Sequence, residues 1–107
     1  MKYCDLHLHS QYSGGDLSCD ELVKRAAKRN ITAISLVDHN TIYGVKEIIE
    51  AGKKKGVEVV PGVEIYTDYK GKGLHLLGYD FDLDHPRLNQ VLDDLQKQHA
   101  EDVQKAF

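Results

Sequence analysis

The sequence is poor in residues that mark specialised classes of protein: its 107 residues include two cysteines, two prolines, one methionine and no tryptophan. The cysteines, Cys4 and Cys19, are too few for the disulfide framework of a small secreted domain. No stretch approaches the roughly 20 consecutive apolar residues of a membrane helix, and the strand-like start leaves no room for a signal peptide. We therefore expect a reduced, soluble, cytoplasmic protein without a membrane partner.

Neither positive nor negative charge is in large excess. The formal net charge is −3, so bulk electrostatics gives no support for tracking along a nucleic acid. Basic clusters at residues 24–29 and 53–55 fall on expected helices, where a solvated helix face explains them. The composition, 41% hydrophobic and 29% charged, is that of an ordinary globular protein. The length suits a single domain over residues 1–107.

Two kinds of periodicity alternate along the chain. Apolar or alternating runs predict strands at residues 2–8, 31–37, 57–66 and 74–81. Amphipathic patterns predict helices at residues 18–29, 41–55 and from 86 onward. Ser18 and Glu21 fit a capping box and Asn30 a helix stop, while Thr41 is expected to cap the second helix and Gly56 to end it. The first helix is expected to bury Leu22, Val23, Ala26 and Ala27.

Alternation of strands and helices predicts an α/β fold with parallel strands, in the order β-α-β-α-β-β-α. Pro61-Gly62 interrupts the third strand, and the polar segment 68–73 predicts a turn, so the fourth strand returns antiparallel or at the rim. Four strands cannot close a barrel, which needs about 250 residues, and the last helical pattern is still in phase at Phe107. We expect the N-terminal part of a longer protein. The alternative is a sheet completed by another copy, and an open edge also favours self-association.

Metal-ligand residue types stand at the downstream ends of all the expected strands. The segments are His7-Leu8-His9, Asp38-His39, Pro61-Gly62-Val63-Glu64 and Leu74-His75-Leu76. Each has an ordinary explanation by itself, such as Asp38 or Asn40 capping the next helix or His75 lying in the core. Because the carboxyl ends of parallel strands meet at one edge, the segments together predict a metal centre.

The pair His7 and His9 offers two imidazoles on one face of a strand, about 7 Å apart along the chain. They can close on one ion at about 2.0–2.1 Å. Asp5 lies on the same face and can orient a ligand. Cys4 lies on the opposite face, which makes a structural zinc site shared with Cys19 geometrically awkward.

Glu64 lies in an apolar strand segment, where a carboxylate is costly to bury unless it is paired or metal-bound; exposure at the strand end is the alternative. A site rich in His and carboxylate without Cys suits zinc, manganese or iron. Two or more such ions polarise phosphoryl oxygens and activate water, so the residue types indicate metal-assisted hydrolysis and leave the substrate open. His85 and His99 fall on the last helix and are interpreted as structural.

The same motifs resemble the first motifs of the PHP (polymerase and histidinol phosphatase) family. The likeness rests on His7-Leu8-His9-Ser10, Val37-Asp38-His39-Asn40, Pro61-Gly62-Val63-Glu64 and Leu74-His75-Leu76-Leu77-Gly78-Tyr79, with Tyr12-Ser13, Leu17-Ser18 and Asp84-His85-Pro86 around them. It covers essentially the whole chain and is strongest toward stand-alone bacterial phosphoesterases acting on nucleotides or short RNA. It implies the N-terminal portion of a distorted (βα)7 TIM-like barrel with two or three divalent metals (Mn, Zn or Fe).

The resemblance also implies roles for individual residues. By the family pattern His7 and His9 bind the first metal, Glu64 bridges the first and second, His75 completes the second and His39 contributes to the third. His7, His9 and Glu64 are then the catalytic set, acting through a water that the metals activate to attack phosphorus.

The sequence departs from the family pattern in two places. The Asp expected for the third metal is replaced by Gly14, and Asp16, two residues later, is a candidate substitute. The family's later ligands, a His and an Asp-x-His pair, have no counterpart before Phe107. We therefore expect the isolated 107 residues to have little or no activity and the longer parent to be active.

Several functions stay open at this point. The leading one is a phosphoesterase acting on a nucleotide, a short oligonucleotide or a small phosphorylated metabolite, with histidinol-phosphate phosphatase as an alternative. Gly14 and the absent ligands motivate another, a non-catalytic metal-binding structural or regulatory module. Hydrolysis of C–N bonds is a third, because a similar metal barrel can activate water against other electrophiles.

Overall fold

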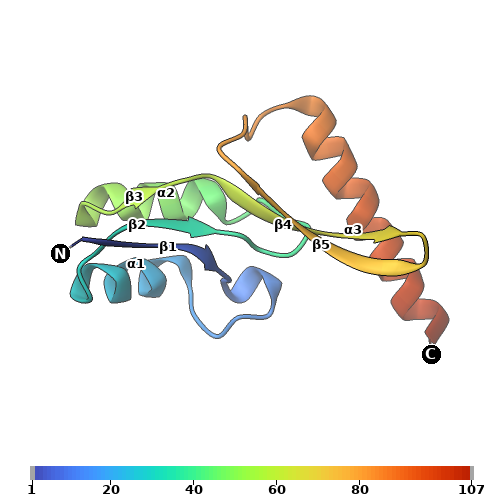
Figure 1. Ribbon diagram of the computed structural model, residues 1–107, viewed down its shortest axis with the longest axis horizontal. Coiled ribbons are helices and arrows are strands. Elements are labelled where there is room, and N and C mark those ends of the chain that lie inside the picture. Colours follow the sequence, from blue (N-terminus) through green and yellow to red (C-terminus); the bar gives the residue numbers. More distant parts are fainter. Residues whose placement is uncertain (1, 107) are drawn as a thin grey trace.

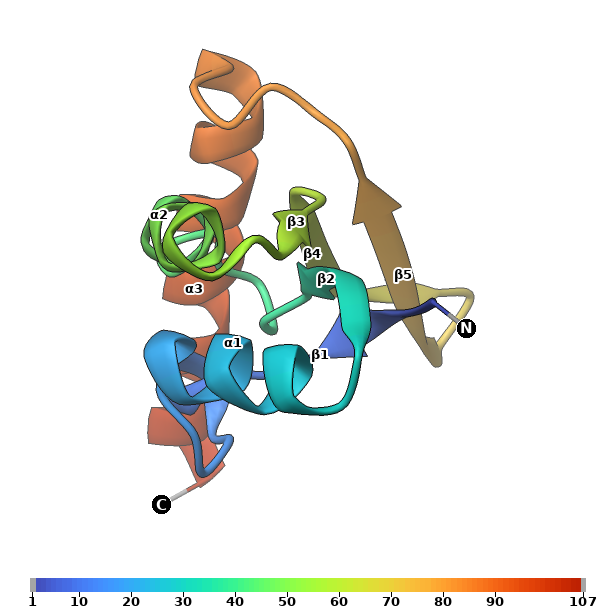
Figure 2. The ribbon, with the colours of Figure 1, turned by 90° about the vertical axis from the view of Figure 1, so that its left-hand side faces the viewer.

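A parallel three-stranded sheet forms the N-terminal half of the molecule. The computed structural model describes residues 2–106. Strands β1 (Tyr3–Leu8), β2 (Ile31–Leu36) and β3 (Glu58–Val59) lie in that order. Helices α1 (Cys19–Lys28) and α2 (Val45–Lys55) connect them and cover the same face of the sheet (Figures 1 and 2). The predicted α/β fold with parallel strands is confirmed.

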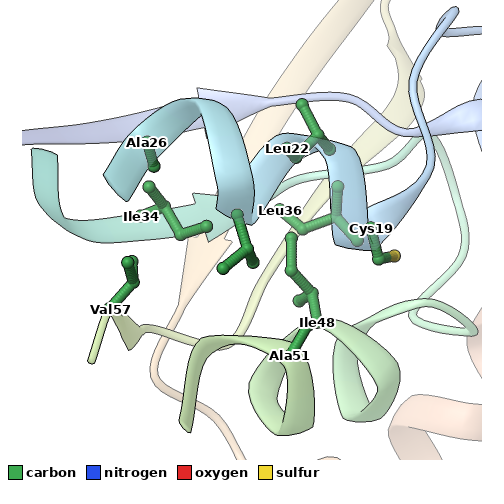
Figure 3. Close-up of a cluster of buried hydrophobic side chains, with 9 residues drawn as sticks. Cys19, Leu22, Ala26, Ile34, Leu36, Ile48, Ala51 and Val57 are labelled. Atoms are coloured by element: carbon green, nitrogen blue, oxygen red, sulfur yellow. The ribbon is translucent and has the colours of Figure 1, made fainter. Parts of the chain in front are cut away.

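The hydrophobic core lies between this sheet and the two helices (Figure 3). Ile34 and Leu36 of β2 point toward the helices and are 0% and 1% exposed. Ser35 on the opposite face of β2, and Val37 just after the strand, are buried as well. Burial on both faces explains why this strand reads as a continuous apolar run. The buried core cluster consists of Cys19, Leu22, Val23, Ala26, Ile34, Leu36, Ile48, Ala51 and Val57.

The helix boundaries partly follow the sequence. The capping box is confirmed, since Ser18 Oγ accepts from the Glu21 amide at 3.2 Å, and Asn30 ends the first helix at a φ of 61°. Ala27, predicted to be buried, is exposed. Thr41 does not cap α2, which begins at Val45 after Gly44. The reason is that residues 38–40 pair through their backbone with a later strand, so the helix starts only after a further turn.

A long antiparallel hairpin follows the parallel sheet. The predicted third strand is divided at Val60-Pro61 into β3 and β4 (Gly62–Tyr69), and β4 pairs with β5 (Lys72–Tyr79). The turn expected over 68–73 is confirmed but is shorter, because Lys70 and Gly71 alone form it, with φ values of 51° and 79°. Two left-handed residues make a tight turn that matches the twist of the paired strands. The antiparallel return of the fourth strand is confirmed.

Helix α3 (Pro86–Ala106) crosses beside the hairpin (Figure 1). Leu92 is buried, whereas Val91, which shares the apolar pattern, is 41% exposed. Gln96 Nε2 donates to the Asn40 carbonyl at 2.8 Å and ties α3 to the loop that follows β2. Across residues 2–106, none of the helices is both long and apolar enough to cross a membrane.

Gly62 is a position where the backbone passes too close to β2 for any side chain. A Cβ there would clash with Ser35 Oγ and lie 2.7 Å from Val37 Cγ1. We expect Gly62→Ala to lower the free energy of unfolding by about 1–3 kcal/mol, because overpacking must be relieved by moving two strands. The matched control is Gly73→Ala on β5, where a Cβ meets nothing within 4 Å. Urea denaturation measures both, and equal midpoints would contradict the argument.

The two cysteines lie in different environments. Cys19 is 1% exposed in the core and its thiol donates to the Gly44 carbonyl at 3.6 Å, whereas Cys4 is exposed. Burial, together with a hydrogen bond to Glu47, raises the pKa of Cys19 to about 12. Because the thiolate is the nucleophile, we expect iodoacetamide at pH 8 to alkylate Cys4 and spare Cys19 until the protein is unfolded. Mass spectrometry of the labelled peptides checks this, and equal labelling of the native protein would refute it.

Candidate metal centre

One buried carboxylate is surrounded by four imidazoles. Glu64 is 5% exposed. Its Oε1 lies 3.3 Å from His7 Nε2, 3.1 Å from His9 Nε2 and 3.7 Å from His39 Nδ1. Its Oε2 lies 3.0 Å from His75 Nδ1. The structure thus gathers the five strand-end residues that the sequence singled out.

The backbone explains how distant segments reach one point. His7 and His9 stand at the end of β1, with ring centroids 5.3 Å apart. The chain after β2 forms a short parallel bridge to β4, in which the Glu64 amide donates to the Asp38 carbonyl at 3.1 Å. On the hairpin, His75 is the register partner of Tyr66, two residues beyond Glu64, so the three side chains share one face.

Asp38 has a different role from the one its sequence context suggested. It is 1% exposed and accepts from the Ser10 amide at 2.7 Å, from Ser10 Oγ at 2.6 Å and from Ser13 Oγ at 2.7 Å. Asn40 Oδ1 accepts from the Tyr66 amide at 2.9 Å. Neither residue caps α2, so that reading of the motif was wrong. Asp38 instead holds the loop after β1, which begins next to His9.

Electrostatics favours a charged carboxylate beside a neutral imidazole. Burial by itself raises the pKa of Glu64, but His39, a hydrogen bond from His7 and the charge of His9 outweigh it, and the pKa lies below its ordinary value. Burial is the largest cause that lowers the pKa of His9, and the nearby His39 lowers it further, although Glu64 opposes the shift. An ionised carboxylate and uncharged imidazoles are the protonation states that a divalent cation requires.

The geometry fits divalent cations. Two ligand atoms held about 2.1 Å from one ion in tetrahedral geometry lie roughly 3.4 Å apart, close to the 3.3 and 3.1 Å from Glu64 Oε1 to His7 and His9. The ligand atoms of these three residues all lie within 4.8 Å of one another. Among the described residues, the buried Nδ1 of His39, which lies 3.7 Å from Glu64 Oε1, has no hydrogen-bond partner, as expected of an atom that faces a ligand. The second carboxylate oxygen, toward His75, gives Glu64 the shape of a bridge.

Other residues named from the sequence lie elsewhere. Asp16 is exposed and outside the group of close ligand atoms, and Gly14 precedes it in a left-handed conformation with a φ of 90°; a role for Asp16 as a metal ligand stays a prediction. Asp5 contacts the backbone amide of His7 at 3.1 Å rather than its ring. His85 Nδ1 accepts from the Arg87 amide at 3.2 Å at the start of α3, a structural contact of the kind expected.

A cavity of about 330 Å³ adjoins the cluster. Gln96 could not be predicted as a lining residue, because nothing in its local sequence marks it, whereas Tyr66 follows Glu64 at the two-residue spacing of one strand face. His99, interpreted as structural from the sequence, lies in the wall of the cavity. The lining residues are Tyr12, Ser13, His39, Asn40, Tyr66, Gln96 and His99.

The curated relatives of this chain include enzymes named for cleaving phosphate esters. A 5'-3' exoribonuclease from Haemophilus influenzae is 44% identical over 91 residues, 85% of this chain and 33% of that protein. A 3',5'-nucleoside bisphosphate phosphatase from Chromobacterium violaceum is 31% identical over 94% of this chain and 35% of its own length. A phosphoribosyl 1,2-cyclic phosphate 1,2-diphosphodiesterase from Eggerthella lenta is 31% identical over 90% of this chain and 38% of its own length. The chain therefore spans about a third of these relatives.

Solved structures of larger proteins superpose closely on this chain. An amidohydrolase from Chromobacterium violaceum, determined with sulfate and without metal, superposes with a TM-score of 0.89 and 29% identity over 95% of this chain and 36% of that one. A structure from Bifidobacterium adolescentis, provisionally named a metal-dependent phosphoesterase, gives a TM-score of 0.82 and 25% identity over 87% of this chain and 32% of that one. The model of the PHP domain matches residues 5–104, and this chain belongs to the PHP domain family.

Proposed function

We propose that the protein carrying this chain is a metal-dependent phosphoesterase. The observation that carries the proposal is the Glu64 carboxylate, 5% exposed and 3.0–3.7 Å from four imidazole nitrogens that come from separate parts of the fold. His7, His9 and Glu64 would hold one divalent cation, His75 and Glu64 would hold a second, and His39 would contribute to a third.

The residues of the chain define what the site does to a substrate. Divalent cations, when bound, polarise a phosphoryl oxygen and lower the pKa of water. Glu64 keeps its charge inside the fold and would supply negative charge to the bound cations. The parallel bridge between His39 and Glu64 keeps these two ligands in register. A site with oxygen and nitrogen ligands suits manganese, zinc or iron.

A nucleotide, a short oligonucleotide or a small phosphorylated metabolite is the proposed substrate. The curated relatives carry names that refer to RNA, to a nucleoside bisphosphate and to a phosphoribosyl cyclic phosphate. A net charge of −3 favours a short phosphorylated molecule over a long nucleic-acid track.

Two other functions have an observation in their favour. Gly14 stands where the family pattern has a metal-binding Asp, which favours a metal-binding module without catalysis. The similarity to a structure named an amidohydrolase favours hydrolysis of C–N bonds. The substrates that the metal-loaded protein hydrolyses distinguish both of these functions from a phosphoesterase.

The test uses the full-length protein that contains this chain. Bound metals are counted by mass spectrometry, and phosphomonoesters, including histidinol phosphate, phosphodiesters and amides are then offered as substrates. We expect two or three cations and phosphoester turnover, both reduced in His9→Ala and unchanged in the matched His85→Ala. Full metal occupancy without turnover would support the non-catalytic module, and amide turnover alone would support C–N hydrolysis. The same assay on the isolated 107 residues tests the expectation that they are weakly active.

A further inference from the structure

The cavity beside the metal cluster shares residues with it. His39 lies in the cavity wall and 3.7 Å from Glu64. The Tyr66 ring also lines the cavity, and its centroid is 4.8 Å from that of His39 and 4.0 Å from that of His75. A ligand that places a phosphate at the cluster therefore extends directly into the cavity. Its volume of about 330 Å³ falls at the lower end of small-molecule sites.

Aromatic rings stand in the cavity wall in fixed positions. Tyr12 lies so close to Gly44 that a Cβ added at Gly44 would be 2.8 Å from Tyr12 Cδ2, and Tyr43 packs edge-on at 5.0 Å. Tyr66 is held by its contacts with the two histidine rings. Both cavity tyrosines still expose part of their surface, 37% for Tyr12 and 43% for Tyr66. Positioned rings with free faces are platforms for stacking a flat ligand.

Two of the polar groups that line the cavity are the side-chain amides of Asn40 and Gln96, beside the Ser13 hydroxyl and the His39 and His99 imidazoles. Asn40 Oδ1 is engaged by the Tyr66 amide, which leaves the Asn40 NH₂ group as a donor. Gln96 Nε2 is engaged by the Asn40 carbonyl, which leaves the Gln96 Oε1 as an acceptor. Among the described residues that line the cavity there is no Lys or Arg. The cavity therefore suits an uncharged ring with one acceptor and one donor on its edge, and not a second phosphate.

We propose that this cavity binds the nucleobase of a nucleotide whose phosphate lies at the Glu64 cluster. The inference rests on the proposed phosphoesterase function and adds a substrate class to it. The base stacks against Tyr12 and Tyr66, and its edge pairs with the amides of Asn40 and Gln96. Because the cavity and the cluster adjoin, the base and the phosphate that they bind belong to the same nucleotide. The site therefore recognises the terminal nucleotide of an oligomer and makes no base contacts with the nucleotides beyond it.

The experiment compares two phosphomonoesters that differ only by the base, adenosine 5'-monophosphate and ribose 5-phosphate. In the full-length metal-loaded protein we expect Tyr12→Leu and Gln96→Leu each to lower kcat/KM for the nucleotide about tenfold, the size of a lost stack or base contact. Ribose 5-phosphate turnover should change less than about twofold. Matched controls are Tyr69→Leu and Gln90→Leu, an exposed tyrosine of the hairpin and a glutamine of the same helix outside the cavity.

Binding is measured in parallel, by isothermal titration with adenosine, which carries no phosphate. Weaker binding in the cavity variants and normal binding in the controls would support a base site even if no phosphoester were hydrolysed, a result that would defeat only the proposed function. Equal losses for both phosphomonoesters would show that the cavity residues merely support the metal cluster. Unchanged kinetics and unchanged adenosine binding in the cavity variants would overturn the inference.

Discussion

Glu64→Gln is expected to lower the affinity for Mn²⁺ or Zn²⁺ by about 100-fold or more. Glutamine keeps the shape of the side chain but loses the charge and one of the two acceptor oxygens. Glu64 is the single carboxylate among the described residues of the cluster, and both of its oxygens face imidazoles, at 3.1 Å for His9 and 3.0 Å for His75. Losing a supporting residue behind a metal ligand already costs 10- to 100-fold, roughly, and a ligand costs at least as much.

The measurement is a titration of the metal-free protein against a competing chelator. Asp68→Asn is the matched control, since it makes the same chemical change on the same strand at an exposed position. We expect the control to bind metal like the wild type and circular dichroism to show that both variants are folded. Equal affinity of the Glu64→Gln variant and the wild type would mean that cations bind elsewhere, and the proposed function would lose its central observation.

Much of this site was accessible from the sequence because its residues follow strands. The carboxyl ends of parallel strands meet, so His7, His9 and His39 converge as soon as β1 and β2 are recognised. Glu64 stood out because a carboxylate inside an apolar run demands a partner. The parallel layout followed from the alternation of strand and helix, a pattern in which local periodicity and overall topology agree.

What the sequence could not supply are contacts between side chains and backbone across long separations. Nothing near Thr41 signals that residues 38–40 pair with β4 and delay α2, since that pairing depends on Glu64. The Lys70-Gly71 turn is set by pairing of the hairpin strands on either side of it, and a polar segment alone does not fix its length. The cavity is invisible for the same reason, because Gln96 and Tyr12 meet only in the folded chain.

Asp38 shows most clearly how such a contact changes an interpretation. Beside His39 in the sequence it reads as a helix cap. In the structure its carboxylate is buried and accepts three hydrogen bonds, two from Ser10 and one from Ser13. Ser10 itself is 0% exposed, so its amide and hydroxyl have no access to water if the carboxylate is removed.

We expect Asp38→Ala to lower the free energy of unfolding by about 3–5 kcal/mol, because each buried donor left without an acceptor costs roughly 1–3 kcal/mol. Asp38→Asn keeps one acceptor oxygen and should lose less, while Asp68→Ala, at an exposed site, should stay within about 0.5 kcal/mol of the wild type. Urea denaturation of the metal-free protein gives all three values. Equal losses for Asp38→Ala and Asp68→Ala would mean that the hydrogen bonds to Ser10 and Ser13 contribute little.

Replacing Asp38 is also expected to affect the metal centre, and the free energy of unfolding does not measure this effect. Ser10 follows His9, and Tyr12 and Ser13 of the same loop line the cavity. If Asp38 fixes this loop, the Asp38→Asn variant, still folded, should bind metal about 10- to 100-fold more weakly, the effect of a residue that orients a ligand. Its metal affinity should fall further than that of Asp68→Asn, which makes the same change at an exposed position away from this loop. An Asp38→Asn variant that is destabilised but binds metal normally would mean that Asp38 stabilises the fold without orienting the metal ligands.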